Sequence, residues 1–76
     1  MKLIFDFRRE ILINMELVSE YWIDSTGEDS YTVCADSHVL KFFNNREEAQ
    51  NLVIQIAYFL SNSKETLFDY EKDYIL

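Results

Sequence analysis

The chain has 76 residues, enough for one small domain, and its fourteen acidic and seven basic side chains give a formal net charge of −7. Such a negative field repels nucleic acids and membrane headgroups, which excludes direct binding to DNA, RNA or lipid as an expected function. The aromatic content of 16% supplies large side chains for burial, so a single compact domain over residues 1–76 is predicted rather than a disordered chain.

The first third of the chain has the alternation that is typical of β-strands. Residues 2–7 are predicted to form a strand, and the basic cluster Arg8-Arg9 that follows is interpreted as ion-pairing or solubilising, with a phosphate site as the alternative. Residues 10–24 fit either a strand or a helix, and their β-branched and aromatic content favours the strand. A strand of about fourteen residues is unusually long, so a bend near Asn14 or Ser19 is expected.

Two further strands are predicted in the middle of the chain. Residues 24–29 have the composition of a turn, in which Gly27 is able to take a positive φ angle. Residues 30–35 alternate as the next strand, residues 36–38 make a tight connection, and residues 39–43 form the strand after it. The expected result is a three-strand antiparallel meander that leads directly into a helix.

A capped amphipathic helix is the clearest element of the sequence. Asn45 fits the N-cap position with Glu48 three residues later, and residues 61–63 end the helix. Six apolar side chains at three- and four-residue steps predict its buried face: Ala49, Leu52, Val53, Ile56, Phe59 and Leu60. Four neutral side chains form the opposite stripe, which is either solvated or in contact with a partner or a second copy: Asn51, Gln55, Tyr58 and Asn62.

The C-terminal residues 65–76 fit two structures. Strict alternation places four large side chains on one face of a strand: Phe68, Tyr70, Tyr74 and Leu76. Helical spacing fits nearly as well, and Ser63 as an N-cap favours the helix. The predicted fold is therefore α+β, an antiparallel β-meander of three to four strands packed by one central helix, with a short C-terminal helix or strand.

One group of residues has the spacing of a metal or Cys–His site. Cys34, Asp36 and His38 would point the same way on an extended backbone. Zinc normally needs three or four protein ligands, and the acidic neighbours favour the neutral thiol, so these residues are interpreted as strand and turn residues. A single glycine excludes a Gly-rich phosphate loop, and we predict no enzyme activity, catalytic residue, metal or cofactor.

The cellular setting follows from the cysteine count and from hydropathy. One cysteine excludes an internal disulfide framework, which favours a reducing compartment. The first residues lack the apolar run of a signal peptide, and no later run reaches the about 18 apolar residues of a membrane span. A soluble, cytoplasmic protein is expected.

The acidic side chains are concentrated in two segments. Residues 11–45 hold six acids against Lys41 alone, a sum of −5, and residues 65–76 hold four acids against Lys72, a sum of −3. Carboxylates two residues apart on a strand are about 6.6 Å apart, of the same order as the about 3.4 Å per charge along a nucleic-acid strand. Nine residues are therefore candidates for binding a partner: Glu16, Glu20, Asp24, Glu28, Asp29, Asp36, Asp69, Glu71 and Asp73.

These features favour a small acidic inhibitor that occupies a basic, nucleic-acid-handling site on another protein by mimicking nucleic acid. In size, acidity and lack of catalytic motifs the chain is similar in kind to phage anti-CRISPR and anti-restriction proteins and to immunity proteins of nuclease toxins. This likeness of type implies evasion of a host defence and transfers no individual residues. The alternatives are a structural homodimer or assembly subunit that associates through the neutral helix face, and acids that serve solubility alone.

Overall fold

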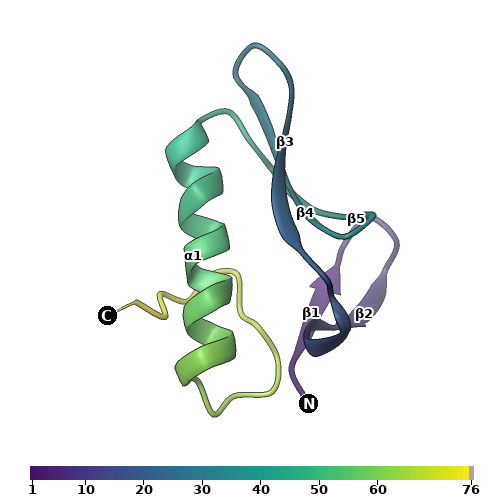
Figure 1. The fold of residues 1–76 in the computed structure, drawn as a ribbon, viewed down its shortest axis with the longest axis vertical. Coiled ribbons are helices and arrows are strands. Elements are labelled where there is room, and N and C mark those ends of the chain that lie inside the picture. The colour runs from purple at the N-terminus through teal and green to yellow at the C-terminus, as the bar shows by residue number, and fades with distance from the viewer. Residues whose placement is uncertain (76) are drawn as a thin grey trace.

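The computed structural model describes residues 1–75, with the side chain of Thr26 left aside. In chain order the elements are β1 (Leu3–Asp6), β2 (Ile11–Asn14), the 3-10 helix η1 (Met15–Leu17), β3 (Tyr21–Gly27), β4 (Ser30–Ala35), β5 (His38–Phe43) and α1 (Arg46–Asn62). Figure 1 shows α1 beside the β3–β5 sheet, the β1–β2 hairpin at the lower end of that sheet, and the C-terminal segment crossing α1. The predicted α+β class is confirmed.

The three-strand meander is confirmed, with strand order β3-β4-β5 and antiparallel pairing throughout. Both connections are two-residue loops, because Gly27 pairs with Ser30 and Ala35 pairs with His38. The expectation of a positive φ at Gly27 is wrong, since Asp29 (φ 53°) takes that conformation instead. Gly27 remains part of the β3–β4 ladder, and aspartate tolerates the left-handed region better than most side chains.

The segment 10–24 is divided instead of forming one long strand. Asn14 caps η1 by accepting a hydrogen bond from the Glu16 amide (3.1 Å), so the chain bends there. A second bend occurs at Ser19, whose amide donates to the Asp36 carboxylate (3.1 Å). The chain bends at both of the positions that were considered for a single bend, and the two bends separate a two-stranded β1–β2 sheet from the three-stranded sheet.

Helix α1 covers one face of the three-stranded sheet. Asn45 is its N-cap, as predicted, and accepts a hydrogen bond from the Glu47 amide (2.7 Å). The core joins the predicted helix face to the sheet and the hairpin: Ala49, Leu52, Ile56 and Phe59 with Ile4, Ile13, Met15, Val33, Ala35, Leu40 and Phe68. Val53 and Leu60 are partly buried against it. Within the described residues, no helix is both long enough and apolar enough to cross a membrane.

The prediction of a C-terminal helix is wrong, and the tail is not a continuous strand either. Residues 63–75 are irregular and pair with β1 at a single parallel bridge between Leu3 and Leu67. The ring of buried Phe68 packs edge-on against Phe59, with 5.3 Å between centroids. This burial of aromatic rings overrides the helical spacing of the segment. Leu76, which the strand alternative included, lies outside the described residues.

Candidate partner-binding surface

Five of the nine candidate acids lie along β3 and at its two ends. Strand β3 is an edge of the three-stranded sheet, and alternation places Asp24 on the face opposite the core residues Tyr21 and Ile23. Glu28 and Asp29 form the tip of the β3–β4 hairpin, which projects beyond the first turn of α1 (Figure 1). We call these five residues the hairpin surface: Glu20, Asp24, Glu28, Asp29 and Asp36.

The carboxylates of the hairpin surface have few internal partners. Asp36 is the exception, because it accepts hydrogen bonds from the amides of Ser19 and Glu20 and thereby holds the bend before β3. Across residues 1–75 the ion pairs join Glu16 to the N-terminal amine, Asp6 to His38, and Glu65 to Lys72. None of them involves the hairpin surface, so its carboxylates other than Asp36 remain available to an external partner.

An exposed indole lies between these acids. Trp22 is 39% exposed and shares its face of β3 with Asp24. Its Nε1–H donates to the backbone carbonyl of Asp36 (2.8 Å), which fixes the ring orientation. A rigid aromatic side chain with a satisfied polar atom is a suitable anchor for a protein interface.

The three acidic residues of the tail form a separate group. Asp69 accepts a hydrogen bond from the Glu71 amide (2.9 Å), as in a tight turn. Asp73 accepts from Gln55 Nε2 on α1 (2.9 Å), and this bond, helped by the Ile75 amide, lowers the pKa of its carboxyl. The tail acids do not join the hairpin surface, because they lie beside β5, the opposite edge of the sheet.

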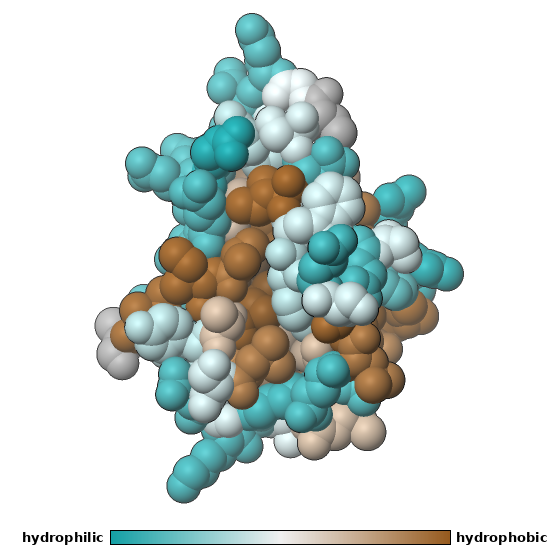
Figure 2. Space-filling model, viewed as in Figure 1, coloured by the Kyte–Doolittle hydropathy of each residue, from teal (hydrophilic) through white to brown (hydrophobic). Residues whose placement is uncertain are grey.

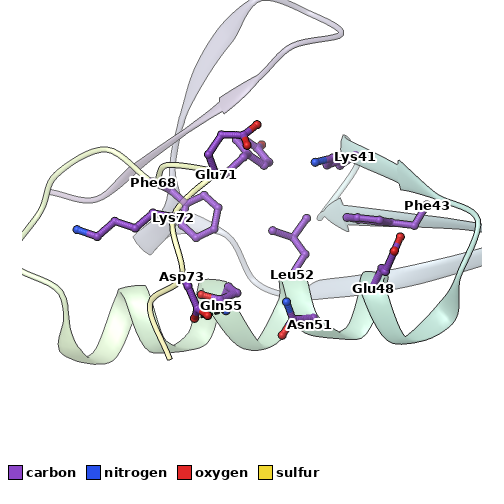
Figure 3. A pocket seen from close by; sticks show the side chains of 11 residues that line it. Lys41, Phe43, Glu48, Asn51, Leu52, Gln55, Phe68, Glu71, Lys72 and Asp73 are labelled. Carbon is purple, nitrogen blue, oxygen red and sulfur yellow. Dashed lines mark hydrogen bonds between the residues drawn. The ribbon is translucent and has the colours of Figure 1, made fainter. Parts of the chain in front are cut away.

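Figure 3 shows the hollow between the tail, α1 and β5. Glu71 and Asp73 come from the tail, Gln55 from α1, and Lys41 from β5. Gln55 is buried under the tail, so the neutral helix stripe predicted from the sequence is interrupted at its centre. Three of its residues remain exposed: Asn51, Tyr58 and Asn62.

Glu16 is the ninth candidate and stands apart from both groups. It lies in η1, accepts a hydrogen bond from the Lys2 amide (3.1 Å), and is 3.7 Å from the N-terminal amine. This residue therefore ties down the start of the chain. The four-residue spacing of Glu16, Glu20 and Asp24 does not place them on one face, because the bends at Asn14 and Ser19 intervene.

Cys34, Asp36 and His38 do not form a site together. The β4–β5 turn separates them, and each side chain has its own contact: Cys34 Sγ with the Thr32 carbonyl, Asp36 with the Ser19 amide, and His38 with Asp6. Burial raises the pKa of the Cys34 thiol, and nearby Asp24 adds to the effect. Residues 1–75 contain no cluster of three His, Cys, Asp or Glu side chains that could hold a metal ion.

The structure reveals one buried acid that the sequence analysis did not identify. Asp6 is fully buried in β1 and accepts hydrogen bonds from the amides of Arg8 (2.9 Å) and Arg9 (3.2 Å). His38 Nδ1 lies 3.3 Å from its other oxygen. An aspartate followed by a loop is a common signal for such a turn, and it was available in the sequence. Asp6 organises the hairpin and offers no free carboxylate to a partner.

The hairpin surface therefore combines exposed and half-buried carboxylates with an aromatic side chain whose orientation is fixed by a hydrogen bond. It is carried by a strand pair of the main sheet, which supplies a fixed spacing between the charges. In comparisons with family models, curated proteins and solved structures, nothing matches this chain.

Proposed function

We propose that this chain is an inhibitor that binds another protein at a basic, nucleic-acid-handling site through the hairpin surface. The observation that supports the proposal most directly is the row Glu20, Asp24 and Glu28 on and beside an edge strand. Across residues 1–75 none of the three has a basic side chain at ion-pair distance. Acidic side chains on an edge strand also discourage a strand of another protein from pairing with β3. The partner would therefore recognise the charges and side chains of the hairpin surface, and not the free backbone groups of the edge.

The length of this row is comparable to a short stretch of phosphate backbone. At about 3.3 Å per residue, Glu20 and Glu28 lie about 26 Å apart along the strand direction, less the shortening at the bulge between Asp24 and Gly27. This length corresponds to about eight phosphates along one strand of a duplex. A groove that binds nucleic acid would meet negative charges over a comparable distance, with Trp22 as the apolar contact.

The partner class is a nuclease or another nucleic-acid-binding protein of a host-defence system, in keeping with the likeness of type noted above. Basic grooves of such proteins attract a chain of net charge −7 and speed its association. We also propose a cytoplasmic location, which the free, buried thiol of Cys34 supports.

The test compares two variants with the same change in net charge. Glu20→Gln/Glu28→Gln removes two charges from the hairpin surface, and Glu10→Gln/Glu65→Gln removes two from exposed positions outside it. Both variants are used to capture partners from lysate of the native host at low salt, and the affinity for each captured protein is then measured. We expect the first variant to bind at least about tenfold more weakly than the second.

Competition between nucleic acid and this chain for the captured protein tests the mimicry itself. Nucleic acid should displace the chain from the captured protein, and the affinity should fall steeply as salt is raised. A partner that binds this chain and nucleic acid simultaneously would refute mimicry, as would equal affinities for the two double variants.

The alternative of a homodimer through the neutral helix face is less well supported. Its central residue, Gln55, is engaged by Asp73 and the Tyr74 amide, so the face does not offer a continuous row of exposed amides. Sedimentation of a Tyr58→Gln variant would test this alternative, because Tyr58 is the largest exposed side chain of that stripe.

A further inference from the structure

The β1–β2 hairpin directs apolar side chains toward solvent. Ile4 and Asp6 of β1 face the interior, so alternation turns Leu3 and Phe5 outward. Phe7, the first residue of the connecting loop, is 63% exposed. Leu12, which pairs with Phe5, is 54% exposed, whereas Leu3 and Phe5 themselves are half-buried.

The outer face continues into two adjoining hollows. The first, of about 450 Å³, is lined mainly by Phe7, Val39, Phe42 and Tyr70. The second shares Phe7 and Tyr70 with it and extends over Phe5, Leu12 and Leu67, the last of which is 52% exposed. We call the two hollows together the apolar groove. Figure 2 shows a smaller group of apolar residues at the lower right of the molecule, where β1 and β2 lie in Figure 1, apart from the larger apolar area left of the centre.

Contacts between aromatic rings and one hydrogen bond hold the walls of the apolar groove together. The Phe5 and Phe7 rings meet edge-on with 4.7 Å between centroids, and the Phe7 and Tyr70 rings are 5.4 Å apart. The Tyr70 hydroxyl donates to the Phe5 carbonyl (2.7 Å), which joins the tail to β1. A preformed apolar surface of this kind loses little conformational entropy on binding.

The charged rim of the groove distinguishes it from the rest of the molecule. The charged residues that line the two hollows are Arg8 and Lys41 against Asp69 and Glu71. The rim is therefore neutral in sum, within a chain of net charge −7. Across residues 1–75, no ion pair involves Arg8 or Glu71.

The charges of the rim indicate which kind of partner the apolar groove binds. A rim of one sign would favour a partner of the opposite charge, whereas a rim carrying both signs can complement itself across a two-fold axis. We propose that the apolar groove docks a second copy of this chain in a symmetric dimer, in which Arg8 of each copy meets Glu71 of the other. The inference goes beyond the proposed function and does not depend on it.

The dimer leaves the hairpin surface accessible. Strand β3 is the edge of the sheet opposite β5, and it is β5 that contributes Val39 and Phe42 to the groove. Two acidic hairpins would therefore lie on the outside of the assembly, where their mutual repulsion is smallest.

A charge-swap experiment tests the pairing directly, with sedimentation as the measurement. Arg8→Glu alone would place like charges opposite each other in its own dimer, and so would Glu71→Arg alone. We expect each variant to dimerise at least about tenfold more weakly than the original chain. An equimolar mixture of the two variants should regain dimers, because both contacts across the axis again join opposite charges.

Matched controls separate this surface from general effects of charge or hydrophobicity. Lys64→Glu changes net charge by the same amount as Arg8→Glu at an exposed site, and should leave dimerisation unchanged. Phe7→Gln should weaken the dimer at least about tenfold, and Tyr58→Gln on the exposed side of α1 should not. Circular dichroism confirms that each variant is folded.

Three results would overturn the proposal. One is an original chain that stays monomeric up to about 1 mM. Another is a mixture of folded swap variants that fails to regain dimers. The third is a dimer that responds to Tyr58→Gln and not to Phe7→Gln, which would place the contact on α1.

Discussion

Three polar side chains fix segments of this chain that local propensity would leave undetermined. The Asp6 carboxylate closes the β1–β2 loop, while the hydroxyls of Tyr21 and Tyr70 donate to the carbonyls of Met15 and Phe5. Each of these groups lies partly or fully away from water and has a hydrogen-bond partner, as buried polar atoms require. The bonds of Asp6 and Tyr21 are local in sequence, whereas the bond of Tyr70 joins the tail to β1 across 65 residues.

The tyrosine hydroxyls lead to a prediction at high pH. Burial raises the pKa of Tyr21 to about 12 from the ordinary value of 10.0, with a smaller contribution from Asp36. Burial also raises the pKa of Tyr70, and Asp6 adds to it. Because the folded chain holds these protons more tightly than the unfolded chain, their contribution to stability is complete below pH 10 and declines above it, and the part that comes from Tyr21 is lost between about pH 10 and about pH 12.

Urea unfolding between about pH 9 and about pH 12 measures this loss. Tyr21→Phe should lower stability at neutral pH by about 1 kcal/mol, the value of one hydrogen bond, and should make the decline above pH 10 shallower. Tyr58→Phe at an exposed site is the matched control and should keep the original slope. A Tyr21→Phe variant with the same decline as the original chain would show that Tyr21 does not contribute to it.

At the scale of elements, sequence reasoning succeeded where the deciding interactions are local. Helix α1 was predicted from its N-cap Asn45 and its apolar period, both of which lie within the helix itself. The tail has a pattern compatible with helix and strand. Its conformation is decided by Phe59, by the Leu3 backbone and by Gln55, which local patterns do not contain.

The same limit applies to the candidate site. The acidic residues could be selected from composition, but their grouping depends on bends and on the sheet edge. Glu16 is separated from Glu20 because Asn14 caps η1 and Asp36 holds the turn at Ser19. The exposure of Phe7 was not predicted either, because the alternation of residues 2–7 indicates a strand without deciding which of its faces is buried.

The contact between α1 and the tail gives a prediction at this scale. Gln55 Nε2 donates to Asp73, and its carbonyl oxygen accepts from the Tyr74 amide. Gln55→Ala removes both bonds, so we expect a loss of about 1–2 kcal/mol in the free energy of unfolding. Hydrogen exchange of the Tyr74 amide should accelerate at the same time.

Asn51→Ala, one turn earlier on the same helix, is the control for this substitution. Its side chain is exposed, so the variant should change stability by less than about 0.5 kcal/mol and leave the exchange of the tail unaltered. Equal effects of the two substitutions would mean that Gln55 does not anchor the tail.

The whole molecule has an uneven charge distribution, and the two proposed interfaces use different parts of it. The hairpin surface carries carboxylates along one sheet edge, and the apolar groove with its neutral rim adjoins the other edge. Figure 1 shows the tip of the β3–β4 hairpin at the top of the longest axis and the β1–β2 hairpin in the lower half of the molecule. A chain of net charge −7 can therefore attract a basic protein at one sheet edge while a second copy binds beside the other.

Salt should affect these two interfaces in opposite directions. Binding of a basic partner gains from long-range attraction, so its affinity falls as screening increases. Two copies of the chain repel one another through their net charges of −7, and screening weakens this long-range repulsion. The contact itself is apolar with a rim of zero net charge, so dimer affinity should rise with salt.

Sedimentation and partner binding measured over the same series, from about 0.05 M to about 0.5 M salt, test this prediction. In Glu20→Gln/Glu28→Gln the repulsion between copies is smaller, so the dimer should be tighter at low salt and its salt dependence flatter. The same variant should bind the basic partner more weakly with a smaller salt slope, because fewer charges contribute. A dimer that weakens with salt as steeply as the partner complex would indicate that ion pairs, and not the apolar groove, hold the two copies together.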